Sequence, residues 1–444
     1  MPPTNRRQLS TIATLILAIA GCSGIGSPST RMSPIAVQPG SDSPGSAAPA
    51  ASASPASAAA GDAWLIVGRT GEETVRVILD STLEELVSLP LGVPDATWGR
   101  ILTATPRDRT TVVEHLMVQP GLGGPRQEID GQWRLPMVGL DPVPVGVSAD
   151  RSTIVLVGEA TPTTSRFAVL DINLATEPRI IELAGAFDYD ALSPDGAILY
   201  VAEHVADPLA GRYQVRAVDT ATGYLRDTII VDKRNLDEVM AGTPIDQDRR
   251  ADGLVLTLYR GAEYPFVHAL DSVEAWAVCI DLPTRGFDDE GAGADWGIVS
   301  VGQGTSIVAV NATLGIAVEI DPTDLTIRRT IDFEASAGAG FALAKFGHGE
   351  IGPAGRRVVA APDGSSVYAA GVGGVVRLGA TDLDVQQRYM TGMSVDSVTV
   401  TPDGETLFVL ARLGGIARLD AHTGELEGWV GDGGFDRLLG ALPW

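Results

Sequence analysis

Cysteine is scarce in this sequence: Cys22 and Cys279 are the only two among 444 residues. Two thiols cannot build the disulfide framework that stabilises many small exported domains, so this fold has to be stabilised by packing. Cys279 lies in the apolar run Ala-Trp-Ala-Val-Cys-Ile. We therefore expect it to be a buried thiol and not a nucleophile.

The sequence also lacks the common catalytic patterns. No GxSxG elbow and no phosphate-binding loop occurs, and no histidine stands in an HxxxH, HxH or CxxCH pattern. The five histidines are His115, His204, His268, His348 and His422. His268 lies in an alternating strand pattern, where a hydrogen-bonded core histidine is the expected role. The sequence thus predicts a binding scaffold without catalysis of its own, and it predicts no cofactor.

Positive charge is in short supply. The chain has 32 Lys and Arg against 56 Asp and Glu, which gives a formal net charge of −24. A chain this acidic repels phosphate backbones, so nucleic acid is excluded as a partner. Anionic lipid headgroups are disfavoured for the same reason.

Long apolar runs are missing too. Residues 9–21 form a short apolar run after Arg6 and Arg7, which is the order of charge, apolar residues and small residues found in export signals. The ending Ile-Ala-Gly-Cys at Cys22 resembles a bacterial lipobox, in which cleavage precedes the cysteine and its thiol takes a diacylglycerol. The alternative is an ordinary signal cut at a nearby small residue. The arginine pair also resembles a twin-arginine signal, and this choice stays open.

Residues 22–61 are mostly Ser, Pro, Ala and Gly. Such a segment buries too little apolar surface to offset the entropy of ordering, so we expect a flexible tether. The predicted organisation is a signal peptide over residues 1–21, a lipid-anchored linker over 22–61 and a folded domain over 62–444. This places the chain outside the cytoplasmic membrane, held to the bacterial cell envelope by palmitate-type acyl chains at Cys22. The expected partners are the membrane through that anchor, and an envelope protein or a small ligand.

A repeat of about forty residues organises the folded domain. In residues 395–430 a β-branched strand precedes Pro402-Asp403-Gly404, three further short apolar or alternating segments follow, and Asp420 opens a DxxTG turn. Proline fixes φ and glycine takes positive φ, so PDG predicts a tight reversal between strands. The PDG turn recurs at residues 194–196 and 362–364, and a degraded copy stands at residues 148–151.

These repeats resemble the YVTN-type and WD-like families, whose unit is one four-stranded propeller blade. The resemblance implies an all-β propeller over residues 62–444, and we count eight blades, with seven as the alternative. Blade one has three strands of its own, at residues 63–68, 75–79 and 84–89. Residues 435–442 are expected to supply its fourth strand and so close the ring.

Binding is expected on the face that carries the loops between blades. Residues 232–252, 284–295 and 333–354 form long loops there, and binding residues commonly lie on loops of a rigid scaffold. Asp95 and three other aspartates, at positions 190, 295 and 396, each precede a predicted inner strand, so they either ring the channel mouth or serve as turn residues. The candidate binding rim consists of Asp190, Asp288, Asp289, Glu290, Asp295, His348, Glu350 and Asp396.

Two further possibilities concern this rim. Calcium could bind the acidic run at residues 288–290, although three successive acids lack the spaced ligands of a dedicated site and fit a solvated loop better. The rival function is a lactonase-like or quinoprotein-like enzyme that uses acids at the channel mouth with a bound metal or cofactor. The propeller fold alone does not choose between these functions.

Overall fold

The computed structural model describes residues 63–443 with internal gaps. The gaps are residues 70–71, 96–97, 119–122, 140–142, 206–211, 235–239, 262, 289–291, 335–354, 413 and 432–433. The described residues form β-strands and two 3₁₀ turns, η2 (Ala292–Ala294) and η3 (Gly302–Gly304), with no α-helix among them. In this part of the chain no helix is therefore long and apolar enough to span a membrane.

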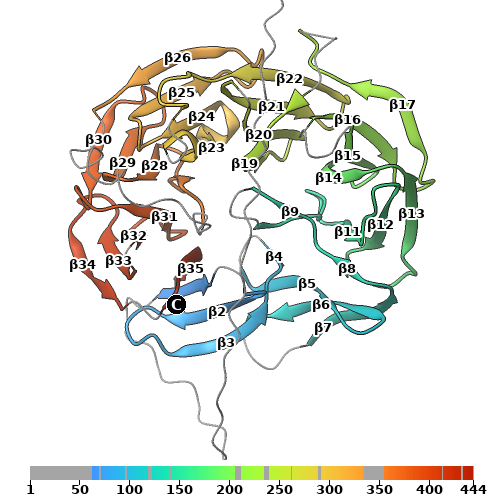
Figure 1. The fold of residues 1–444 in the computed structure, drawn as a ribbon. Coiled ribbons are helices and arrows are strands. Elements are labelled where there is room, and N and C mark those ends of the chain that lie inside the picture. The colour runs from blue at the N-terminus through green and yellow to red at the C-terminus, as the bar shows by residue number, and fades with distance from the viewer. Residues whose placement is uncertain are drawn as a thin grey trace, which may run out of the picture. The chain divides into compact units, whose positions relative to one another are not determined.

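Eight antiparallel blades stand around a ring, which confirms the eight-bladed propeller (Figure 1). We letter the strands of each blade A to D from the inside outwards. Blade one contains β35 (Arg437–Pro443), β1 (Ala63–Gly68), β2 (Thr74–Leu79) and β3 (Glu85–Pro90), and blade two contains β4 (Val93–Pro94), β5 (Arg100–Pro106), β6 (Thr110–Met117) and β7 (Gly123–Asp130). Blade three contains β8 (Trp133–Arg134), β11 (Thr153–Gly158), β12 (Thr164–Asp171) and β13 (Arg179–Ala184). Blade four contains β14 (Phe187–Leu192), β15 (Ile198–His204), β16 (Arg212–Asp219) and β17 (Leu225–Ile230).

The second half of the chain repeats this plan. Blade five contains β19 (Thr243–Arg249), β20 (Leu254–Arg260), β21 (Pro265–Asp271) and β22 (Trp276–Asp281), and blade six contains β23 (Trp296–Val301), β24 (Ser306–Asn311), β25 (Ile316–Ile320) and β26 (Ile327–Asp332). Blade seven contains β27 (Val358–Ala360), β28 (Ser366–Gly371), β29 (Gly374–Gly379) and β30 (Val385–Tyr389). Blade eight contains β31 (Val395–Val400), β32 (Thr406–Ala411), β33 (Ile416–Asp420) and β34 (Leu426–Val430). The short strand β18 (Met240–Ala241) is added to blade four, and β9 (Met137–Val138) and β10 (Val143–Pro144) form a separate hairpin.

The C-terminal strand closes the ring as predicted. β35 pairs antiparallel with β1 from Ala63 opposite Pro443 to Gly68 opposite Arg437, so the end of the chain supplies strand A of blade one. Apolar side chains of blades eight and one pack across the junction, among them Leu65, Phe408 and Leu438. Closure leaves no inner strand of blade one unpaired, which removes an edge that would invite aggregation.

The repeated turns are built from side-chain hydrogen bonds. In blade four the Ser193 hydroxyl donates to Asp195 Oδ1 (2.7 Å), and the Ala197 N–H donates to the same oxygen (3.0 Å). Gly196 follows at φ 71°, a conformation that favours glycine. These hydrogen bonds lower the pKa of Asp195. Thr401 and Asp403 make the same contact in blade eight (2.6 Å), so the sequence repeat reflects one repeated turn.

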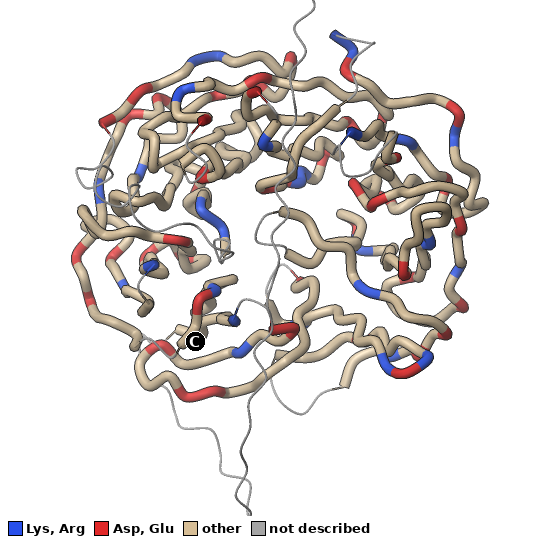
Figure 2. Tube along the Cα trace, in the orientation of Figure 1, with Lys and Arg blue, Asp and Glu red and all other residues tan. Residues whose placement is uncertain are grey.

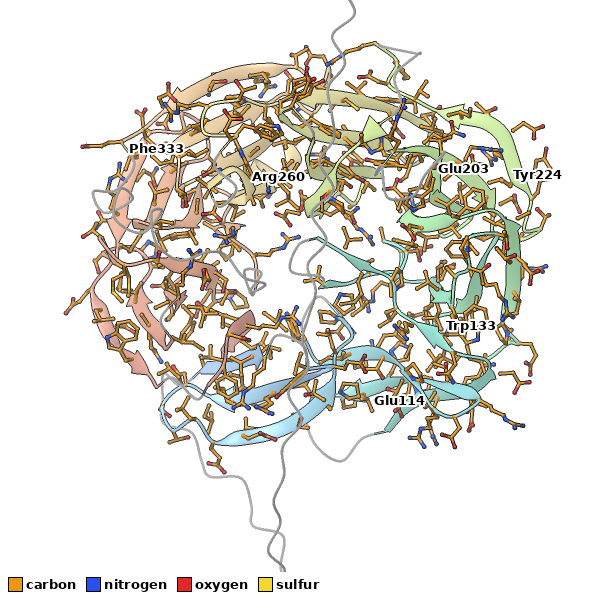
Figure 3. All side chains as sticks on the ribbon, in the orientation of Figure 1. Glu114, Trp133, Glu203, Tyr224, Arg260 and Phe333 are labelled. Atoms are coloured by element: carbon orange, nitrogen blue, oxygen red, sulfur yellow. The ribbon has the colours of Figure 1, made fainter. Side chains whose placement is uncertain are left out.

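The apolar core lies between neighbouring blades. The middle strands are buried on both faces, as β24 and β28 show, whereas the outermost strand β26 is largely exposed. Trp133 is fully buried between blades two and three (Figure 3), where it packs with Leu102 and Ile154. Truncating such a side chain to alanine costs about 3–5 kcal/mol of the free energy of unfolding.

Two expectations about the inner strands are wrong. The predicted loop at residues 232–252 contains a strand, because β19 occupies residues 243–249 and forms strand A of blade five. Asp95 follows strand A of blade two and does not precede it, so it lies in the A–B turn at the opposite end of the channel. Strand β19 was missed because most of its residues are polar, and β4 was missed because it is only two residues long, Val93–Pro94.

Candidate functional site

Two cavities line the channel. The first, of about 390 Å³, lies between blades three, four and five, and we call it the Asp190 cavity. The second, of about 610 Å³, is lined by residues of blades one to five and by residues 355–356, and we call it the Arg249 cavity. Val138 and Gln247 line both, so the two cavities adjoin at these side chains. Both volumes lie in the usual range of small-molecule sites.

The β9–β10 hairpin forms part of both walls. Strand A of blade three is interrupted: β8 pairs with β11 at Gly158, and Val147 forms a bridge with Ile154, while the residues between them leave the sheet. Figure 1 shows β9 extending from blade three toward the middle of the ring. Proline lacks an N–H for the sheet ladder, and Pro136 precedes β9 while Pro144 ends β10, which helps to explain why the segment leaves the sheet of blade three.

Asp190 is the buried acid of the first cavity. It lies at a β-bulge in β14, between Tyr189 and Ala191, and its side chain is only slightly exposed. Its Oδ2 atom is buried and has no hydrogen-bond partner among the described residues, and the same holds for the Tyr189 hydroxyl. Burial raises the pKa of Asp190 to about 6, against the opposing charge of Arg249. The carboxyl group therefore titrates close to neutral pH.

Arg249 lies at the boundary between the cavities. Its Nε donates to Gln247 Oε1 (2.6 Å), and its guanidinium lies 5.7 Å from the centroid of the Tyr189 ring. Gln247 is held in turn by the Thr257 hydroxyl, to which its Nε2 donates (2.9 Å). Nη2 of Arg249 is buried without a hydrogen-bond partner in the described part of the chain. A buried guanidinium donor left unpaired is costly, so a bound water molecule or a ligand group would stabilise it.

Four arginines line the second cavity: Arg151, Arg249, Arg250 and Arg356. Figure 2 shows basic segments on the inner side of the ring as well as on its rim. Two aspartates share this wall, but their oxygens accept backbone N–H groups: Ser300 donates to Asp248 (2.9 Å) and Gly99 to Asp95 (2.9 Å). The cavity thus carries more positive than negative charge, in a chain whose net charge is −24.

The predicted rim residues are distributed over several places. Asp295 is buried, pairs with Arg357 (3.1 Å) and accepts the Thr313 hydroxyl (2.6 Å), so it ties blade six to blade seven. Asp396 pairs with Arg412 (2.7 Å) within blade eight, and Asp288 is exposed in a turn. Asp289, Glu290, His348 and Glu350, like Cys22, lie outside the described residues. Among the described acids of the candidate binding rim, Asp190 alone lines one of the two cavities, while Asp95 lines the second cavity from the other end of strand A.

His268 and Cys279 lie opposite each other on β21 and β22. His268 is in the core as predicted, but neither ring nitrogen has a hydrogen-bond partner among the described residues. Burial lowers its pKa to about 4, so the ring is neutral at neutral pH. Cys279 is half-buried, less enclosed than its apolar surroundings suggested.

A calcium or other metal site requires several ligating side chains close together. Within the described ranges, no group of three or more His, Cys, Asp or Glu side chains is arranged to hold a metal ion. The sequence did not identify β19 as a polar strand of the site. In this strand Asp246, Gln247 and Asp248 follow Ile245 in succession. The only sequence signal for this strand was the adjacent pair Arg249 and Arg250 at its end.

Comparison with solved structures places this geometry in context. The dihydro-heme d1 dehydrogenase NirN in complex with DHE aligns with a TM-score of 0.51 and 15% identity over 86% of this chain and 75% of that one. Apo AztD from Citrobacter koseri aligns with a TM-score of 0.52 and 13% identity, over 86% of this chain and 98% of that one. The likeness shows the fold. No family model matches the chain, and no curated protein matches it.

Proposed function

We propose that this protein is a lipid-anchored, extracytoplasmic propeller that binds a small ligand inside its channel. The observation that carries the proposal is the unsatisfied wall between the two cavities, where Asp190 Oδ2, the Tyr189 hydroxyl and Arg249 Nη2 are buried without partners in the described chain. Nearly all buried polar groups in proteins are hydrogen-bonded, and these three exceptions lie at two adjoining cavities, Asp190 and Tyr189 on the first and Arg249 on the second, which fits a site that a ligand completes.

The membrane part of the proposal rests on the sequence around Cys22. A lipid on this cysteine followed by a tether over residues 23–61 would hold the propeller near the membrane surface. Palmitate labelling in a bacterial host should depend on Cys22, because the Cys22→Ser variant has no thiol at that position. Equal labelling and equal membrane retention of the variant would contradict the anchor and leave the channel proposal standing.

Ligand binding is tested by blocking the mouth of the Asp190 cavity. Ala160 is exposed and lines this cavity, so Ala160→Trp should obstruct it without disturbing the core. Glu159→Trp is the matched control, because Glu159 is exposed next to it and does not line the cavity. Full-length protein extracted in detergent is examined by native mass spectrometry for a bound small molecule. We expect a mass excess in the parent and the control and its loss in Ala160→Trp.

A second candidate is an enzyme of the lactonase-like or quinoprotein-like kind. The observation that favours it is the pKa of Asp190, about 6, since a general base works best when its pKa is near the working pH. Catalytic turnover of a lactone by the parent, lost in Asp190→Asn, would favour this reading. Ligand binding with no turnover would favour the binding protein.

A further inference from the structure

The A–B turn of blade three contains an arginine where the other copies have glycine. The Ser148 hydroxyl donates to Asp150 Oδ1 (2.7 Å) and the Ser152 N–H donates to the same atom (2.8 Å), as in the PDG turns of blades four and eight. Arg151 thus occupies the position of Gly196 and Gly404, and it has a φ of 57°. This backbone conformation strains any residue that has a Cβ atom.

Strain of this kind clusters at functional sites, but eight other non-glycine residues of the described chain also have a positive φ, so the position of the Arg151 side chain decides the argument. Arg151 lines the Arg249 cavity, and its Nη1 donates to the Pro94 carbonyl of blade two (3.2 Å). The strained turn therefore brings a guanidinium from blade three to the same cavity as Arg249 from blade five.

Many arginines elsewhere in the propeller are paired with carboxylates, although among the described residues Arg234 and Arg377 donate only to carbonyl or hydroxyl oxygens. Arg418 pairs with Asp80, Arg329 with Glu319 (2.5 Å) and Arg357 with Asp295 (3.1 Å). By contrast, Arg151 and Arg249 contact a backbone carbonyl and an amide oxygen, and neither forms an ion pair with a carboxylate of the described chain. Two guanidinium groups that stay protonated at every relevant pH thus line one cavity with no counter-charge at ion-pair distance among the described residues; Asp190, whose carboxyl group is influenced by the charge of Arg249, lines the adjoining cavity.

The other charged groups of this wall do not supply that counter-charge. Arg250 is bound to Asp252 (2.5 Å) and to the Gly304 carbonyl (2.8 Å). Asp248 accepts the Ser300 N–H and lies 4.0 Å from Arg356, whose Nη2 donates to the Gln247 carbonyl (3.1 Å). Asp95 is bound within its own turn and to the exposed Arg100 (3.5 Å).

We infer that the Arg249 cavity binds a small organic or inorganic polyanion, with Arg151 and Arg249 as its principal ligands. Guanidinium groups bind carboxylate and phosphate groups through paired N–H donors, so a molecule with two or more such groups could engage both arginines together. A cavity of about 610 Å³ has room for it. This inference rests on the proposed channel binding and names the chemical class of the ligand.

The test uses full-length protein in detergent with citrate and pyrophosphate as probes and sorbitol as the uncharged control, by calorimetric titration at constant ionic strength. We expect saturable binding of at least one of the two anions and none of sorbitol. Arg249→Gln should weaken it by about tenfold or more, while Arg249→Lys should weaken it less because it keeps the charge. Arg126→Gln, on an exposed outer strand, should bind like the parent.

Arg151→Gly separates binding from stability, because it places at this position the glycine that the PDG turns of blades four and eight have, Gly196 and Gly404. We expect its melting temperature to rise by about 1–2 °C, since the strain is relieved, while anion affinity falls about tenfold. Gln303→Gly is the matched control: Gln303 is exposed at a φ of 55° in the A–B turn of blade six and does not line the cavity. It should gain the same stability and keep the parent affinity.

Two results overturn the inference: neither anion binds the parent, or Arg151→Gly and Arg249→Gln bind as the parent does. The outcome for the proposed function is separate. If the native mass excess disappears in Ala160→Trp while both anions fail to bind, the channel binds a ligand that is not a polyanion. If the parent shows no mass excess and neither anion binds, both proposals fall.

Discussion

The junction of blades eight and one and the inner wall of blades three to five are built in opposite ways. At the junction, Arg418 pairs with Asp80 and with Glu427 (2.7 Å), and Asp80 also accepts the Ala63 N–H (3.0 Å). At the inner wall, Asp190 and Arg249 leave buried atoms without partners among the described residues. The charged pair named at the junction is thus satisfied by the junction's own residues, whereas the wall leaves buried polar atoms that the proposed ligand would satisfy.

The most damaging change should be removal of the closing strand. Deleting residues 435–444 removes β35 and leaves β1 without its inner neighbour. We expect the melting temperature to fall by about 10 °C or more with aggregation on heating, because an inner sheet edge is exposed. Differential scanning calorimetry with light scattering measures both. An unchanged melting curve would show that the junction does not stabilise the ring.

The next largest effect concerns His268, near the wall. Its folded pKa is about 4, below its unfolded value of about 6.5, so the unfolded chain takes up a proton first as the pH falls. Stability from this group is full above pH 6.5 and is lost toward pH 4, by about 3 kcal/mol. His268→Leu should lose less stability than the parent between pH 7 and pH 4 in urea unfolding. Parallel losses in the two proteins would refute the assignment.

Asp190 should have an effect of similar size and opposite pH direction. Its folded pKa of about 6 exceeds the usual 3.8, so the folded protein retains a proton that the unfolded chain releases. Stability from this group is present below pH 3.8 and falls as the pH rises to 6, by about 3 kcal/mol in all. Relative to the parent, Asp190→Asn should therefore gain about that amount between pH 4 and pH 7. The same pair of urea titrations measures it, and a constant difference would count against a buried, unpaired carboxyl group.

The smallest effect tests whether the A–B turn of blade three, apart from Arg151, is as stable as the A–B turn of blade eight. Thr401→Ala removes the hydroxyl that contacts Asp403 (2.6 Å) and accepts the Thr406 N–H (3.0 Å), and should cost about 1 kcal/mol. Ser148→Ala removes the equivalent contacts to Asp150 (2.7 Å) and Thr153 (3.0 Å). Equal losses of melting temperature are expected. A much larger loss in one variant would show that the two turns are not equivalent.

The regular parts of the fold could be predicted from sequence, because their information is local. A PDG turn needs only consecutive residues, so the turn at residues 194–196 and the last strand could be recognised directly. The channel could not be predicted in the same way. Its strand β19 alternates Asp and Gln with one isoleucine, which lacks an apolar signature, and the β9–β10 hairpin interrupts a strand that the repeat pattern would continue.

The candidate site could be predicted only in part, because only some of its residues stand in patterns that consecutive residues reveal. Asp190 was named because it stands beside a predicted inner strand, and it does line a cavity. Arg151 and Arg249 were not named, because their shared cavity brings together blades three and five, which are about a hundred residues apart in the chain and meet only in the folded propeller. The one local clue was the arginine that replaces glycine in a recognisable turn.

The pairing of β1 with β35 also has a consequence for biogenesis. Because the earliest strand of the propeller is completed by the latest, blade one cannot reach its final form until every other blade has been synthesised. Chain segments that pair across such a large sequence separation form slowly. If the chain is exported unfolded, its ring would be open during passage and its channel would form only after β35 has crossed the membrane.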